Sequence, residues 1–175
     1  MFGRLRYLLT LSRPRFWLYL AGPIAVAVPF GVSATDGLFT PVTLPLFAYF
    51  LLPANVFLYG INDVFDADVD VENPKKEGRE TRWQGDPLVS ATVVASGLLG
   101  VGTFALTPRV SWPYLAGFFF LAAQYSAPPL RFKTTPFADS VSNGLYILPG
   151  AAAYAAVAGV HPPVAALARA WLRTV

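Results

Sequence analysis

The sequence contains no cysteine and a single histidine, His161. Without cysteine the chain can form no disulfide, no thiolate metal site and no cysteine nucleophile. One histidine also argues against a zinc site built from several histidines and against a histidine-based triad. His161 follows an apolar stretch, and we expect it at the level of the lipid headgroups on the outer side of a membrane.

Charged residues are scarce. They make up 13% of the 175 residues, whereas 55% are hydrophobic, and an ordinary soluble domain is about 25% charged. The net charge of +3 comes mostly from arginines near the ends of apolar segments, which fits an inner membrane surface better than nucleic acid. The length allows one domain at most. We therefore predict that residues 1–175 form a single membrane domain, with membrane lipids and not nucleic acid around it.

Five apolar stretches are long enough to be candidate membrane spans, since a span needs about twenty apolar residues. They cover residues 16–32, 40–61, 88–106, 110–125 and 137–160. A sixth apolar pattern begins after them but reaches two arginines before it is long enough to cross. The predicted fold class is all-α, a multi-span transmembrane helical bundle of about five spans.

The basic residues predict how this bundle is oriented. The ends assigned to the inside carry four basic residues before the first span, four between the second and third, and two between the fourth and fifth. The ends assigned to the outside carry none, one and none. Because basic residues concentrate on the cytoplasmic side, we expect a multi-pass protein of the cell membrane, with its N-terminus and its acidic loop in the cytoplasm.

A run of carboxylates directly follows the second apolar stretch. Eight of the ten acidic residues lie between Asp63 and Asp86. On a helix, Asp63, Asp66 and Asp70 project within roughly 60° of one another and repel each other. A divalent cation removes this repulsion, and Mg²⁺ prefers hard oxygen ligands, commonly one or two carboxylates with substrate phosphates. The sequence thus predicts that these three aspartates hold Mg²⁺; the alternative is a solvated helix end that carries surface charge.

Several short motifs resemble those of one known family. Residues 62–70 (NDVFDADVD) resemble the first aspartate-rich motif, NDxxDxxxD, of the UbiA superfamily of intramembrane prenyltransferases. Residues 124–133 (QYSAPPLRFK) resemble the YSxPPLRxK loop of that superfamily, and the pairs at 13–14 and 136–139 also have counterparts. Within the superfamily, residues 58–76 are most similar to lycopene elongases of bacterioruberin biosynthesis.

The resemblance implies a bundle of about nine spans, of which this chain would be the first part. It also implies a second aspartate cluster after the sixth span. After Asp86 the only acidic residue here is Asp139. We therefore expect an incomplete, N-terminal portion of a UbiA-type prenyltransferase.

The activity that the resemblance implies is a Mg²⁺-dependent transfer of a prenyl group from an allylic diphosphate to a lipophilic acceptor. The favoured donor is dimethylallyl diphosphate, which would add a C5 unit to a carotenoid such as lycopene. Asp63, Asp66 and Asp70 would be the catalytic metal ligands. The predicted substrate-binding residues are Asn62 and Tyr125 beside the donor, Arg131 and Lys133 on its phosphates, and Asn55 and Asp139, for which an interhelical or capping hydrogen bond is the alternative.

Other functions stay open. A UbiA-type enzyme could instead use a quinone precursor, chlorophyllide or a glyceryl phosphate lipid as its acceptor. From another class, the chain could be a truncated, inactive membrane fragment that retains cation or lipid-phosphate binding. A transporter with a cation site would need charges near the midplane of the bilayer, whereas the aspartates lie at the end of a helix, so this reading ranks last.

Overall fold

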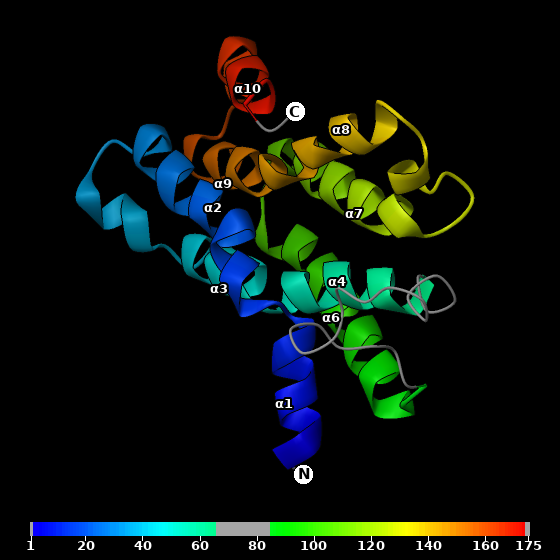
Figure 1. Cartoon of the computed structure of the whole chain (residues 1–175). Coiled ribbons are helices and arrows are strands. Elements are labelled where there is room, and N and C mark those ends of the chain that lie inside the picture. Colours follow the sequence, from blue (N-terminus) through cyan, green and yellow to red (C-terminus); the bar gives the residue numbers. More distant parts are fainter. Residues whose placement is uncertain (1, 66–84, 174–175) are drawn as a thin grey trace.

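The computed structural model describes residues 2–65 and 85–173, and all regular structure in these ranges is helical (Figure 1). The α-helices are α1 (Phe2–Leu11), α2 (Trp17–Gly31), α3 (Thr43–Leu51), α4 (Pro53–Phe65), α6 (Pro87–Leu106), α7 (Trp112–Ser126), α8 (Ala138–Ser142), α9 (Leu148–Ala158) and α10 (Val164–Trp171). Short 3₁₀ turns join them: η1 (Pro14–Phe16), η2 (Thr35–Phe39), η4 (Arg109–Ser111), η5 (Phe132–Thr134) and η6 (Asn143–Tyr146). The predicted all-α class is confirmed.

Three helical stretches are long and apolar enough to cross a membrane: Thr43–Phe65, Pro87–Leu106 and Ala138–Ala158. They coincide with the second, third and fifth predicted spans. The first and fourth predicted spans fall on α2 and α7, which have 15 residues each. The chain is therefore an integral membrane protein.

The second span contains a break between α3 and α4, caused by a proline. Pro53 has no N–H to donate, and Leu52 before it leaves the helical conformation, with φ −126° and ψ −61°. The side chain of Asn55 stabilises the break, because its Nδ2 donates hydrogen bonds to the carbonyl oxygens of Phe50 and Leu51, each at 3.0 Å. α4 continues the same span beyond the break, and its far end carries Asp63, the first aspartate of the acidic run.

The core forms where segments far apart in the sequence meet. In Figure 1, α9 lies beside α2, and α4 lies beside α6. Gly150 allows the first contact, because a Cβ at this position would lie only 2.7 Å from the carbonyl oxygen of Pro23. The rings of Phe50 and Phe118, both fully buried, pack edge to face at 4.9 Å and join α3 to α7. Together these contacts bring η1, the end of α4 and the end of α7 to one side of the bundle.

Candidate functional site

A polar cavity of about 220 Å³ lies where the start of α2, the second half of α4, the end of α7 and η6 meet. Its walls are unusually aromatic, with one phenylalanine and four tyrosines. The lining residues are Arg13, Phe16, Tyr19, Leu58, Tyr59, Asn62, Tyr125, Asn143, Leu145 and Tyr146. The cavity therefore contains two of the predicted site residues, Asn62 and Tyr125, and is bordered by a third, Asp63, which is the next residue on α4.

Oxygen atoms are buried at this end of α4. Asp63 is only 3% exposed, and Asn62 is 9% exposed. Within the described residues the Oδ1 atom of Asn62 is buried and has no hydrogen-bond partner. A buried carbonyl oxygen without a donor is costly to leave unsatisfied. Amide and carboxylate oxygens are the hard ligands that suit Mg²⁺, so the residue types at this end of α4 fit this ion.

Arg13 pairs with the buried aspartate and was not among the predicted site residues. Its Nη2 lies 3.5 Å from the Oδ1 of Asp63, and its guanidinium lies over the ring of Tyr59, 4.6 Å from the centroid. Arg13 adopts a left-handed conformation, with φ 50° and ψ 71°, immediately before Pro14. This turn directs the side chain from the α1–η1 junction towards α4. The signal in the sequence is the Arg13-Pro14 pair, which indicates the topology and the family resemblance but not this contact.

The predicted phosphate-binding loop docks at the same end of α4. Arg131 also has a left-handed backbone, with φ 43°. Its Nη2 donates to the carbonyl oxygen of Phe65, the last residue of α4, at 3.3 Å. Lys133 follows in η5, where partial burial lowers the pKa of its ammonium group. The structure thus brings Arg131 beside the acidic motif. This agrees with the predicted topology, in which the loop after the second span and the loop after the fourth span lie on the same side of the membrane.

Asp139 acts on the cavity through a tyrosine. The hydroxyl of Tyr125 donates to the Oδ1 of Asp139 at 3.0 Å, and Tyr125 lines the cavity whereas Asp139 does not. The backbone carbonyl of Asp139 accepts a hydrogen bond from the Oγ of Ser142 at 2.6 Å. These contacts favour the hydrogen-bonding role that the sequence left open for Asp139 over direct contact with a ligand.

The remaining predicted residues lie elsewhere. Asn55 is fully buried at the α3–α4 break, where its amide holds two backbone carbonyls, and it does not line the cavity. Asp66 and Asp70 lie outside the described residues. Within residues 2–65 and 85–173, no group of three or more His, Cys, Asp or Glu side chains is placed to hold a metal ion, so the three-aspartate site stays a prediction.

The fold of this membrane protein is similar to that of a solved UbiA homologue. Two solved structures of a UbiA homologue from Archaeoglobus fulgidus have this fold. One, bound to GPP and Mg²⁺, matches with a TM-score of 0.71 and 25% identity over 96% of this chain and 59% of its own. Another, bound to DMAPP and Mg²⁺, has a TM-score of 0.68 and 27% identity over 94% of this chain and 59% of its own. No family model matches the sequence.

Among curated proteins, the chain is similar to lycopene elongase/hydratases. It is 68% identical to that of Haloferax volcanii over 171 residues, which cover 98% of this chain and 57% of the relative. It is 59% identical to that of Halobacterium salinarum, over 95% of this chain and 61% of the relative. These comparisons confirm the resemblance to the UbiA superfamily and, within it, to the lycopene elongases. The chain spans roughly three-fifths of the length of these relatives.

Proposed function

We propose that this chain provides the donor-binding part of a Mg²⁺-dependent prenyltransferase. The reaction would transfer a C5 unit from dimethylallyl diphosphate to a carotenoid such as lycopene. The observation that carries the proposal is the buried Asn62–Asp63 pair, which faces Arg13 at the edge of a cavity walled by aromatic rings. Similarity to lycopene elongase/hydratases over 98% of the chain supports it, and so does the match to a UbiA homologue bound to DMAPP.

The cationic side chains around the end of α4 suit a diphosphate. A guanidinium has five N–H donors, so Arg13 can hold Asp63 and a phosphate oxygen at the same time. Arg131 is fixed at the end of α4 by its bond to Phe65, close to where the acidic motif continues. Lys133, whose pKa is lowered by burial, would regain favourable interactions for its charged form beside a phosphate.

Mg²⁺, when bound, would neutralise the diphosphate and stabilise it as a leaving group. Asp63 would hold the ion together with Asp66 and Asp70. We place Asn62 either on the same ion through its buried Oδ1 or on a diphosphate oxygen through its amide.

The aromatic walls suit the other half of the donor. When the allylic C–O bond breaks, pyrophosphate leaves with the electron pair and an allyl cation remains. The π faces of aromatic rings stabilise cations, most strongly where water is excluded. Tyr19 and Tyr146 meet edge to face at 6.0 Å in the cavity wall, and Tyr125 is held by Asp139. A new C–C bond would then form from a terminal double bond of the acceptor, which afterwards loses a proton.

The proposal includes an orientation in the membrane. Arg13, Asp63 and Arg131 lie at one end of the bundle, and basic residues are concentrated on that side of the predicted topology. We place this end, with the N-terminus and the acidic loop, on the cytoplasmic side, where a water-soluble diphosphate is made available to the cavity.

The test is Mg²⁺-dependent binding of dimethylallyl diphosphate to the purified chain, with prenyl transfer to lycopene measured in membranes that contain it. Asp63→Asn and Asp66→Ala should weaken binding at least tenfold. Asp36→Asn is the matched control, because Asp36 is exposed in η2, and it should bind like the wild type. Equal binding by all four proteins, with or without Mg²⁺, would contradict the proposal and leave the reading of an inert membrane fragment.

A further inference from the structure

One wall of the polar cavity contains a phenol that is hydrogen-bonded to a carboxylate behind it. The hydroxyl of Tyr125, at the end of α7, donates to the Oδ1 of Asp139, in the first turn of α8, at 3.0 Å. Tyr125 lines the cavity and Asp139 does not, so the carboxylate reaches the cavity only through the phenol. The phenol oxygen also has lone pairs that accept. It can therefore take a proton from the cavity while it passes its own proton to Asp139.

Local structure fixes the carboxylate in this position. The backbone N–H of Asp139 donates to the carbonyl oxygen of Thr135 at 3.1 Å, and its own carbonyl oxygen accepts from the Oγ of Ser142 at 2.6 Å. Asp139 is half-buried, and it follows the second polar loop closely in the chain. A proton taken up by its carboxylate can therefore pass on to water.

The proposed reaction needs a proton acceptor at this cavity. The new C–C bond uses the two π electrons of the acceptor's double bond, which leaves a cation on the neighbouring carbon. The cation is quenched when an adjacent C–H bond gives its electron pair to a new double bond, or when water adds to it. In either case one proton must leave, and a general base must lie within hydrogen-bond reach of that proton.

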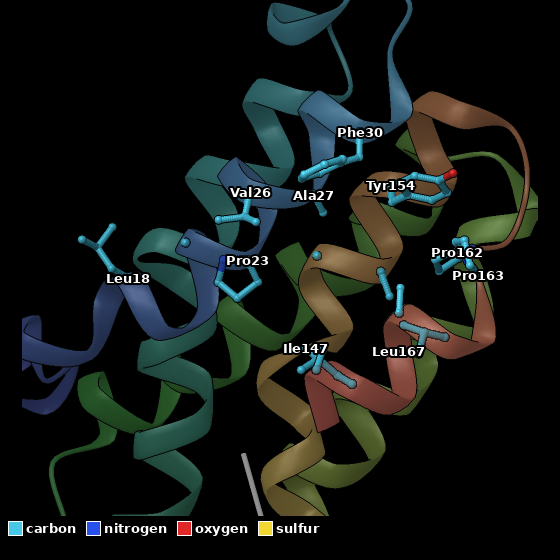
Figure 2. Close-up of a pocket in the computed structure, with 15 residues that line it drawn as sticks. Leu18, Pro23, Val26, Ala27, Phe30, Ile147, Tyr154, Pro162, Pro163 and Leu167 are labelled. Carbon is cyan, nitrogen blue, oxygen red and sulfur yellow. The ribbon is translucent and has the colours of Figure 1, made fainter. Parts of the chain in front are cut away.

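Other groups of the described residues suit this task less well. None of their carboxylates or imidazoles lines the cavity. Asp63 borders it, but its charge is paired with Arg13 at 3.5 Å, and the Mg²⁺ of the proposed reaction would bind it. His161 is bonded to the first turn of α7, whereas the cavity lies at the last turn. Figure 2 shows the large apolar hollow between α2, α9 and α10, and no side chain that lines it is charged.

We propose that Tyr125 and Asp139 together form the proton acceptor of the transfer reaction. The inference rests on the proposed function, because it assigns the step that completes the same reaction. The Oη atom of Tyr125 takes the proton from the cationic product or from the water that adds to it. The phenol proton moves to the Oδ1 of Asp139, which later releases it to water. The electron pair of the broken C–H or O–H bond stays with the product, so no oxidant or reductant is needed.

Two substitutions remove the proton acceptor and keep the shape of the site. Tyr125→Phe keeps the ring and removes the hydroxyl. Asp139→Asn keeps an oxygen that can accept the hydrogen bond of the phenol, but an amide does not take up the proton. Asp139→Glu restores a carboxylate at the same position. Tyr114→Phe is the matched control, because its hydroxyl is also hydrogen-bonded, to His161 at 3.0 Å, but Tyr114 does not line the cavity.

The experiment compares two rates in membranes that contain the full chain, Mg²⁺ and lycopene. Dimethylallyl diphosphate labelled with ¹⁸O at its bridging oxygen reports cleavage of the allylic C–O bond, because cleavage and recombination scramble the label among the phosphate oxygens. Radiolabelled carbon from the donor that enters the carotenoid reports completed transfer. A merely structural role would lower both rates together, whereas loss of the proton acceptor lowers transfer relative to cleavage.

We expect the ratio of transfer to cleavage to fall at least tenfold in Tyr125→Phe and in Asp139→Asn, since general bases contribute about 10²–10⁴-fold. The ratio should recover at least threefold from Asp139→Asn to Asp139→Glu, and Tyr114→Phe should stay within twofold of the wild type.

The outcomes separate this inference from the proposed function when Mg²⁺-dependent donor binding is measured on the same purified proteins. An unchanged ratio in both variants would overturn the inference alone and leave pyrophosphate as the proton acceptor. A fall in Tyr125→Phe but not in Asp139→Asn would overturn the role of the carboxylate. Donor binding by the wild type with neither scrambling nor transfer would overturn the inference while the donor site stands. No donor binding would overturn the proposed function and the inference with it.

Discussion

At the scale of single residues, Arg13 is the side chain on which the site depends most directly. It neutralises a carboxylate that is 3% exposed and stacks on Tyr59. Loss of a partner from a buried hydrogen bond to a charged group costs about 1.5–3 kcal/mol. We expect Arg13→Gln to lower the free energy of unfolding by this amount and to weaken diphosphate binding about tenfold or more. Unfolding by denaturing detergent, followed by circular dichroism, measures the first effect.

Arg109→Gln is the matched control for this prediction. Arg109 also stacks on an aromatic ring, that of Trp112, at 5.8 Å from the centroid, but it does not line the polar cavity. Loss of an exposed cation–π contact costs about 0.5–1 kcal/mol, and diphosphate binding should not change. Equal losses of stability and of binding in the two variants would contradict the role given to Arg13.

Residue types and spacing could predict part of the site. Asn62, Asp63 and Tyr125 do meet at or beside one cavity, and Arg131 does reach the end of α4. Arg13 was missed because its role depends on a left-handed turn that no periodicity reveals. Asn55 was included because helical spacing places it on the same stripe as Asn62 and Asp63. In the structure its amide donates to a backbone carbonyl at the break between α3 and α4. The sequence does not show this contact, because it depends on the conformation of Leu52.

At the scale of helices, some glycines lie where two helices are in close contact and others lie on open surface. A Cβ at Gly150 would press on the backbone of Pro23, which cannot move aside, whereas Gly102 on α6 has nothing within 4 Å. We expect Gly150→Ala to lower the free energy of unfolding by about 1–3 kcal/mol, as overpacking does. Gly102→Ala should raise it by about 0.5–1 kcal/mol through helix propensity. Thermal unfolding in micelles measures both, and a stabilised Gly150→Ala would contradict the close contact of α2 with α9.

The apolar runs in the sequence predicted where the helices lie, but they did not predict which helices contact one another. The contact between α2 and α9 joins segments more than a hundred residues apart in the chain, and hydropathy carries no signal for such pairing.

At the scale of the whole molecule, the two ends of the bundle differ in chemistry. One end gathers Arg13, Asp63 and Arg131 around the polar cavity. Tyr114 at the start of α7 and His161 after α9 meet in a hydrogen bond of 3.0 Å, at the opposite end of α7 from Tyr125. Under the proposed function, a donor that carries several negative charges would bind at the end that gathers Arg13 and Arg131.

The absence of cysteine makes the orientation of these ends directly measurable, because any introduced cysteine is unique. Thr135 lies in the loop after η5, beside the cavity end, and Ser33 lies in the turn after α2; both are exposed. If basic residues set the topology, a membrane-impermeant maleimide added to intact cells should label Ser33→Cys and not Thr135→Cys, and permeabilised cells should label both. Labelling of Thr135→Cys alone in intact cells would invert the bundle. The diphosphate site would then face away from the cytoplasm, so this result would contradict the orientation on which the proposed supply of donor depends.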